Sequence, residues 1–174
     1  MKLRCDLSVN GGFRKLLIVP GPSETGEHLA LKLAGFLLFW DFEPQVEVSA
    51  KHPALTEFEF MPDVLALQDD GSIRIWVECG KTTMNKMLKL TRRLPHSRIV
   101  VLKETEAEAQ RLRRDLTEEL ERSERIEILA FPGAGFKEWY STLAEKNEVY
   151  GEADPLSLNL VINNHAIHAE LRKF

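Results

Sequence analysis

Residues 62–81 read PDVLALQDDGSIRIWVECGK and predict a hairpin at the centre of the fold. Two apolar runs, predicted as strands over 60–68 and 72–79, flank a turn in which Asp70-Gly71 suits a two-residue hairpin loop. With that loop, Asp63 stands directly opposite Glu78 on one face of the hairpin, with Cβ atoms about 5 Å apart. A three-residue loop would move the two acids to opposite faces unless a β-bulge restored the register.

Turn and periodicity signals on both sides of this hairpin predict further strands and helices. Terminal hairpins are indicated at Asn10-Gly11-Gly12, between 2–9 and 15–19, and at Asn163-Asn164, between 156–162 and 166–172. Helices are expected over 23–40, capped by Ser23, and over 82–94, 105–124 and 136–145, with other strands over 45–50, 98–103 and 126–131. The order predicts an α/β (α+β) fold with one central mixed β-sheet flanked by helices, in a single domain over 1–174.

The composition is that of a globular protein. Apolar residues make up 44% and charged residues 29% of 174 residues, which argues against a disordered or fibrous chain. No apolar run reaches the roughly 18 residues of a membrane span, and the N-terminus lacks the features of a signal peptide. Cys5 and Cys79 are too few for a disulfide scaffold or a cysteine zinc site. We therefore expect a soluble cytoplasmic protein with no membrane partner.

The net charge of −4 conceals a segregation of charge along the chain. No acid occurs between Cys79 and Lys103, a stretch that carries a charge of +7 and leaves −11 for the remainder. Its basic residues are Lys81, Lys86, Lys89, Arg92, Arg93, Arg98 and Lys103. Such a stretch predicts a positive surface that attracts phosphate, although a solvated helix face is the alternative interpretation.

Two facing carboxylates are unfavourable unless a cation or a shared proton lies between them. Asp63 and Glu78 are therefore candidate ligands of Mg²⁺ (or Mn²⁺), which prefers carboxylates, waters and a substrate phosphate. Glu24 or Glu27, on one face of the first helix, would supply another carboxylate. The alternative is that these acids face solvent or pair with nearby lysines. A catalytic lysine that stabilises the phosphate would be Lys81, Lys86 or Lys89, the last two in the helix after the hairpin.

The order of a helix acid, then Pro62-Asp63, then an acid followed by a lysine resembles the PD-(D/E)XK nuclease superfamily. More narrowly, the helix opening PSETGE (22–27) and the WVECG block (76–80) resemble the YaeQ family. The resemblance implies a restriction-endonuclease-like core with additional terminal hairpins and a site compatible with Mg²⁺. One position departs from the superfamily pattern, because Gly80 stands where the lysine belongs and Lys81 follows one residue later. Either the chain turns Lys81 back, or Lys86 or Lys89 takes its role.

Two functions remain open from the sequence. The first is a Mg²⁺-dependent nuclease that hydrolyses phosphodiester bonds in nucleic acid, guided along its backbone by Arg92, Arg93 and Arg98. The second is a catalytically inactive module with a nuclease fold that binds or regulates through its basic helix surface alone. The acids favour the first function, and the displaced lysine favours the second.

Overall fold

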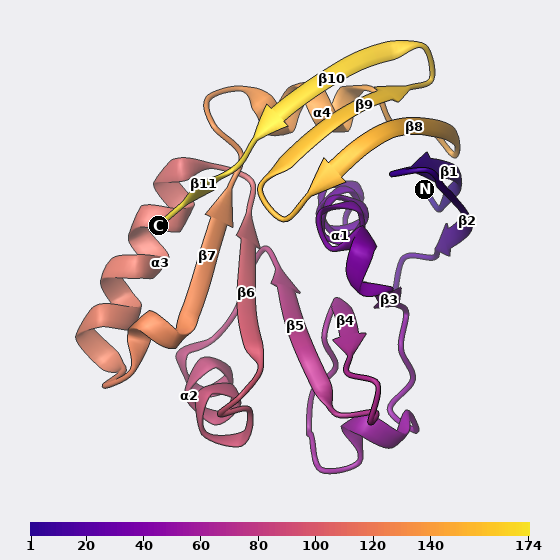
Figure 1. Ribbon diagram of the computed structural model, residues 1–174. Coiled ribbons are helices and arrows are strands. Elements are labelled where there is room, and N and C mark those ends of the chain that lie inside the picture. The colour runs from indigo at the N-terminus through magenta and orange to yellow at the C-terminus, as the bar shows by residue number, and fades with distance from the viewer.

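The computed structural model describes residues 1–174, and its strands form two sheets (Figure 1). The five-stranded sheet has the order β10 (His165–Glu170), β9 (Ser157–Ile162), β8 (Lys146–Asp154), β1 (Leu3–Val9) and β2 (Gly12–Ile18). The six-stranded sheet has the order β11 (Arg172–Lys173), β7 (Ile126–Ala130), β6 (Arg98–Lys103), β5 (Ile73–Cys79), β4 (Val64–Leu67) and β3 (Gln45–Val46). The helices are α1 (Gly26–Leu38), α2 (Met84–Arg93), α3 (Glu106–Glu119) and α4 (Gly135–Ser141). The α+β class is confirmed, but the strands form two mixed sheets instead of the single predicted one.

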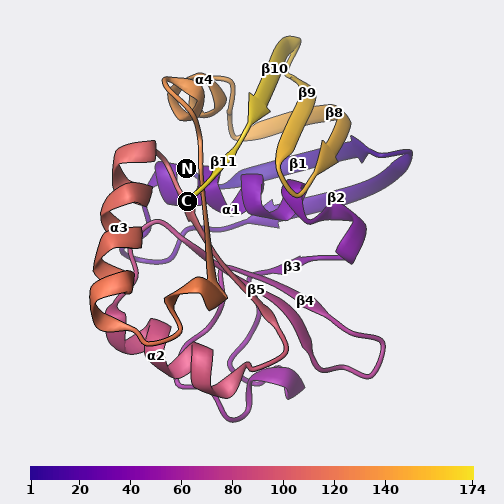
Figure 2. The same cartoon turned by 60° about the vertical axis from the view of Figure 1, so that its left-hand side comes forward.

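Helix α1 lies between the two sheets (Figures 1 and 2). Every residue from Leu29 to Leu38 is buried, including Lys32. One hydrophobic cluster joins this helix to side chains of both sheets, such as Leu7 of β1 and Val77 of β5. A helix that is apolar almost all round is expected to be buried in this way.

The opposite face of the six-stranded sheet is covered by α2 and α3 (Figure 2). Trp76 and Val101 of the sheet pack there with Leu90 of α2 and Leu116 of α3 in a second cluster. The neighbouring strands β5, β6 and β7 run parallel to one another and are buried on both faces. This burial explains why their sequences are nearly continuous apolar runs. No helix of the protein is both long and apolar enough to cross a membrane.

The two terminal hairpins are confirmed, and β8 unites them. Asn10, Gly11, Asn163 and Asn164 all have positive φ, as the favoured two-residue hairpin turns require. The sequence did not predict β8, whose outward residues are mostly polar. It pairs in parallel with β1 and antiparallel with β9, so both hairpins enter one sheet. The added strand therefore joins the two hairpins into a sheet of their own, separate from the six-stranded sheet.

Candidate metal centre

The central hairpin has the predicted register, but its turn differs from the predicted one. Val64 stands opposite Val77 and Leu65 opposite Trp76. The Asp63 amide donates to the carbonyl of Val77 at 2.9 Å, so the pairing extends toward the predicted acid pair. The predicted two-residue loop is wrong: residues 69–71 form a three-residue loop, closed by a hydrogen bond from the amide of residue 68 to the carbonyl of residue 72. A register shift beside Leu67 then restores the alignment.

The carboxylates of Asp63 and Glu78 nevertheless turn to different partners. Glu78 lies on the α2 face, where its carboxylate accepts hydrogen bonds of 2.6 Å from Trp76 Nε1 and from Lys86 Nζ. Asp63 precedes the first residue of β4 and points toward α1, where Oδ1 lies 2.9 Å from His28 Nε2. Each carboxylate of the expected pair therefore has partners of its own, Asp63 on α1 and Glu78 on β5 and α2.

Asp63 belongs instead to a polar cluster on α1, which we call the α1 cluster: Glu24, His28, Lys32, Glu47 and Asp63. His28 Nε2 lies 3.2 Å from Glu24 Oε1 as well as 2.9 Å from Asp63 Oδ1. Lys32 Nζ lies 2.5 Å from Glu24 Oε1, 3.1 Å from Glu47 Oε1 and 3.8 Å from Asp63 Oδ1. His28 and Lys32 lie four residues apart on one side of α1, and Glu24 precedes the N-cap Thr25 by one residue.

The residues that open α1 hold this cluster in place. The predicted N-cap Ser23 is wrong, because the hydroxyl of Thr25 accepts the hydrogen bond from the amide of His28. Glu24 Oε2 accepts a 2.7 Å hydrogen bond from the amide of Gly21, which fixes the carboxylate at the helix entrance. A Cβ atom at Gly26 would overlap the hydroxyl of Tyr140 on α4. The opening sequence therefore positions both Glu24 and His28.

Hydrogen bonds set the charge of the buried groups in the α1 cluster. Burial opposes ionisation of Glu24, but hydrogen bonds from the Gly21 amide and Lys32 outweigh it and lower the pKa of Glu24. The hydrogen bond with Asp63 raises the pKa of His28 against the effect of burial. Burial likewise opposes the charge on Lys32, whose side chain is only 9% exposed, yet hydrogen bonds to Glu24 and Glu47 raise its pKa. Lys32 is thus a charged ammonium held among carboxylates.

Glu24, His28 and Asp63 each offer one ligand atom, and these atoms lie within 4.8 Å of one another. Two carboxylate oxygens and one imidazole nitrogen form a mixed donor set that a divalent cation can accept. Of the four predicted metal ligands, Glu24 and Asp63 come together here, whereas Glu78 turns to α2. Glu27 lies outside this group. Its charge adds to the effect of burial, which is the main cause of the raised pKa of Glu104.

His28 and Lys32 were not predicted as site residues, although they follow Glu24 at intervals of four residues, a spacing that could have identified them. The packing of α1 against the start of β4 brings both side chains to Asp63.

None of the three predicted catalytic lysines contacts the α1 cluster. Lys86 pairs with Glu78 and Lys89 with Glu59, whereas Lys81 lines a separate hollow beside α2. The lysine in the α1 cluster is Lys32, from a helix that precedes both acidic strands in the chain.

The predicted nucleic-acid-binding arginines are mostly engaged by carboxylates. Arg93 pairs with Glu59, and Arg98 makes two hydrogen bonds to Glu127, of 2.8 and 3.2 Å. Arg92 is exposed and has no ion pair. The continuous basic surface expected from the charge segregation is therefore largely neutralised by acids from other segments.

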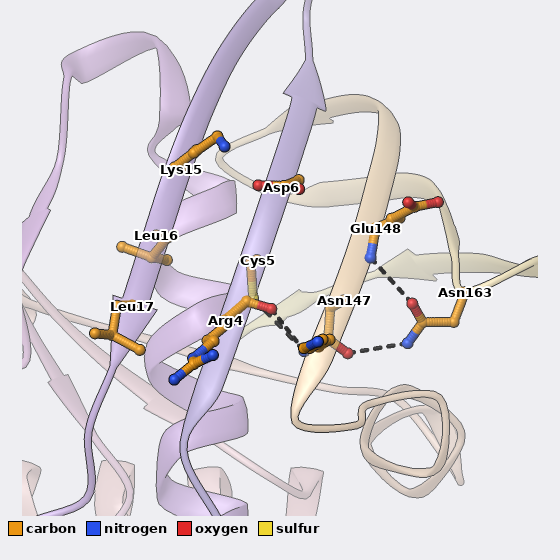
Figure 3. A pocket seen from close by; sticks show the side chains of 10 residues that line it. Arg4, Cys5, Asp6, Lys15, Leu16, Leu17, Asn147, Glu148 and Asn163 are labelled. Atoms are coloured by element: carbon orange, nitrogen blue, oxygen red, sulfur yellow. Dashed lines mark hydrogen bonds between the residues drawn. The ribbon is translucent and has the colours of Figure 1, made fainter.

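The most voluminous of the principal hollows lies elsewhere, on the five-stranded sheet (Figure 3). It measures about 620 Å³ and lies over β1, β2 and the start of β8. Asn147 at its base is satisfied within the chain, because its side chain bonds Ala144 and Asn163. Burial raises the pKa of the adjoining Cys5 thiol to about 11, so the thiol stays protonated at neutral pH. This hollow gathers no metal-ligand set, and we place the candidate site at the α1 cluster.

Comparison with known proteins identifies close matches in fold. A sequence model of the family described as "YaeQ protein" matches residues 14–152. The crystal structure of the YaeQ protein from Xanthomonas axonopodis pv. citri superposes with a TM-score of 0.76 at 15% identity, covering 99% of this chain and 96% of that one. The YaeQ protein from Pseudomonas syringae superposes with a TM-score of 0.72 at 13% identity, covering 99% and 93%. Comparison with curated protein sequences gives no match.

Proposed function

This chain belongs to the YaeQ family, and from its α1 cluster we propose that it is a divalent-metal-dependent hydrolase of phosphodiester bonds in nucleic acid. The observation that carries the proposal is the convergence of ligand atoms from Glu24, His28 and Asp63 within 4.8 Å, beside the buried ammonium of Lys32. A ligand set of this kind, with a positive group next to it, suits the anionic transition state of phosphoryl transfer.

Each residue has a distinct role in the proposal. Glu24, His28 and Asp63 hold the ion, and the imidazole makes the set better suited to Mn²⁺ than to Mg²⁺. A bound divalent ion would acidify a water molecule and polarise a phosphoryl oxygen. Lys32 keeps its proton among the carboxylates and would donate to a non-bridging oxygen of the phosphate as negative charge develops there.

The alternative of an inactive module, relying on the basic helix alone, has less support. Lys86, Lys89 and Arg93 of α2 are already paired with carboxylates, so that helix offers few free charges to a phosphate backbone. The α1 cluster, by contrast, collects charged groups whose burial costs free energy. A bound ligand that interacts with these charged groups would offset part of that cost.

Metal binding is tested first, by calorimetric titration with Mn²⁺. We expect the wild type to bind and Glu24→Gln and Asp63→Asn to lose at least tenfold in affinity. Glu27→Gln is the matched control, since Glu27 lies on the first turn of α1 but outside the ligand set, and it should bind like the wild type. Glu78→Gln should also keep its affinity, which separates this site from the one predicted by the hairpin register.

Cleavage is tested with single- and double-stranded DNA and RNA in the presence of Mn²⁺. Asp63→Asn should abolish cleavage, and Lys32→Met should abolish it while Mn²⁺ still binds. Circular dichroism confirms that each variant is folded. A wild type that neither binds Mn²⁺ nor cleaves any of these substrates would overturn the hydrolase proposal.

A further inference from the structure

A second polar hollow lies beside the α1 cluster, among the β5–α2 loop, the end of β6 and helix α3. It measures about 480 Å³, and three basic side chains line it: Lys81, Lys103 and Arg111. Two acids, Glu108 and Asp115, also line it. We call it the basic hollow.

The basic side chains of this hollow lack the carboxylate partners that Lys86, Lys89 and Arg93 of α2 have. Lys81, Lys103 and Arg111 form no ion pair, and Lys103 Nζ donates only to a neutral acceptor, the carbonyl of Gly80, at 2.5 Å. Burial lowers the pKa of Lys103, the charges of Glu108 and Glu104 oppose this shift, and the charges of Arg111 and Lys81 add to it. Three basic and two acidic side chains therefore line the hollow, and none of the three basic ones is in an ion pair.

The two acids of the hollow are engaged elsewhere. Glu108 closes the capping box of α3, with Oε2 accepting hydrogen bonds from the amide and hydroxyl of Thr105. Asp115 lies 3.8 Å from its neighbour Arg114. With three basic and two acidic side chains, the lining keeps an excess of one positive charge, which favours an anion from outside the protein.

The hollow also offers donors that do not depend on the basic side chains. Helix α2, ten residues long, begins at its edge, and Thr83 and Met84 line it. The Thr83 hydroxyl accepts from the amide of Lys86, while the first amides of a helix point outward and favour a phosphate. Thr82 also lines the hollow, and its hydroxyl oxygen is the one buried side-chain polar atom in the protein without a hydrogen-bond partner. Such a group is unusual in a folded protein and calls for a partner from outside.

Gly80 connects the basic hollow to the α1 cluster. Its carbonyl accepts from Lys103, and a Cβ atom at Gly80 would lie 3.7 Å from Nδ1 of His28. Gly80 directly follows β5, whose end lies beside the end of the parallel strand β6 (Figure 1). Ligands of parallel sheets bind at the carboxyl ends of the strands, where both features lie.

We infer that the basic hollow binds a phosphate group. In the hydrolase proposed above, on which this role in nucleic-acid binding rests, the basic hollow holds the phosphate that neighbours the scissile bond of nucleic acid. The α1 cluster would then act on one phosphate of the chain while Lys81, Lys103, Arg111 and the first turn of α2 fix the next.

The test is a titration of the metal-free protein with inorganic phosphate in EDTA at constant ionic strength, followed by amide chemical shifts. We expect saturable shifts over residues 81–85 and at least tenfold weaker binding in the Lys81→Ala/Arg111→Ala double variant. Both of its side chains are exposed, so the variant should fold, which circular dichroism checks. Lys137→Ala on α4 removes an exposed basic side chain that does not line the hollow, so this control should bind like the wild type. Absent saturation, or equal weakening by Lys137→Ala, would overturn the inference.

Two further arms separate this inference from the hydrolase proposal. Asp63→Asn should retain phosphate binding, because the assay contains no metal. A dinucleotide phosphodiester should produce the same shifts as phosphate. Binding of inorganic phosphate without the dinucleotide would support the phosphate site and overturn its role in holding nucleic acid.

Discussion

The pair of Glu78 and Lys86 allows a sharp separation of structural from catalytic roles. Glu78 is 4% exposed, and its carboxylate is held by Trp76 and by Lys86 alone. Replacing Lys86→Met removes the only positive charge that contacts this buried acid. We expect a loss of folding stability that depends on pH, because the acid can respond only by taking up a proton.

The size of this loss follows from the ordinary pKa of glutamate. Burial raises the pKa of Glu78, so the folded state binds its proton more tightly than the unfolded state, and stability falls as pH rises above 4.5. Protonating the carboxyl at pH 7 costs at most about 3.4 kcal/mol, at about 1.4 kcal/mol for each pH unit above 4.5. Lys86→Met should therefore destabilise the protein by about 2–3 kcal/mol at pH 7 and by no more than about 0.7 kcal/mol at pH 5.

The assay is urea unfolding of the wild type and variants at pH 7 and pH 5, followed by tryptophan fluorescence. Glu78→Gln/Lys86→Met should recover most of the loss at pH 7, because the amide still accepts from Trp76 without carrying a charge. Lys89→Met, which breaks the exposed pair with Glu59, should cost less than about 1 kcal/mol at either pH. Equal losses for the two lysine variants, or a loss that does not shrink at pH 5, would show that Lys86 does not compensate the buried charge of Glu78.

Three other predictions concern the backbone, His28 and Cys79. Gly151 has a φ of 140°, and a Cβ atom there would overlap a carbonyl oxygen of β9, so Gly151→Ala should lower the free energy of unfolding by more than about 2 kcal/mol. Gly11→Ala, where the space is open, should lower it by about 1 kcal/mol. Urea unfolding measures both losses. The hydrogen bond with Asp63 raises the pKa of His28 above 6.5, so the stabilisation from this pair is complete below pH 6.5 and is lost as pH rises through the folded pKa. Asp63→Asn should lower the pKa of His28 in an NMR titration of its ring protons. An unchanged pKa would contradict the pairing of His28 with Asp63. Burial raises the pKa of Cys79 well above its ordinary value, so the native protein should leave this thiol unmodified by a thiol reagent that reacts fully in urea.

The strongest local signals of the sequence were confirmed. The Asn-rich turns at 10–11 and 163–164 and the strand at 98–103 lie where the sequence predicted them, because turn chemistry and continuous burial leave local marks. The strand β8 was missed because its outward residues are polar and its partners, β1 and β9, are decided by pairing across the chain. This unpredicted strand joins the two terminal hairpins into a sheet of their own.

The candidate site shows the same division. Local patterns were enough to predict that Asp63 and Glu78 stand at the ends of paired strands and that Glu24 lies at the start of the first helix, because strand pairing and helix capping depend on neighbouring residues. The direction in which the side chains turn depends on the packing of distant segments. Asp63 precedes its strand, and its carboxylate points to α1, where it pairs with His28 and Lys32. Glu78 lies within β5, so its side chain faces α2 and pairs with Lys86. Side-chain direction at a strand end depends on what packs against it, and that information lies in distant parts of the chain.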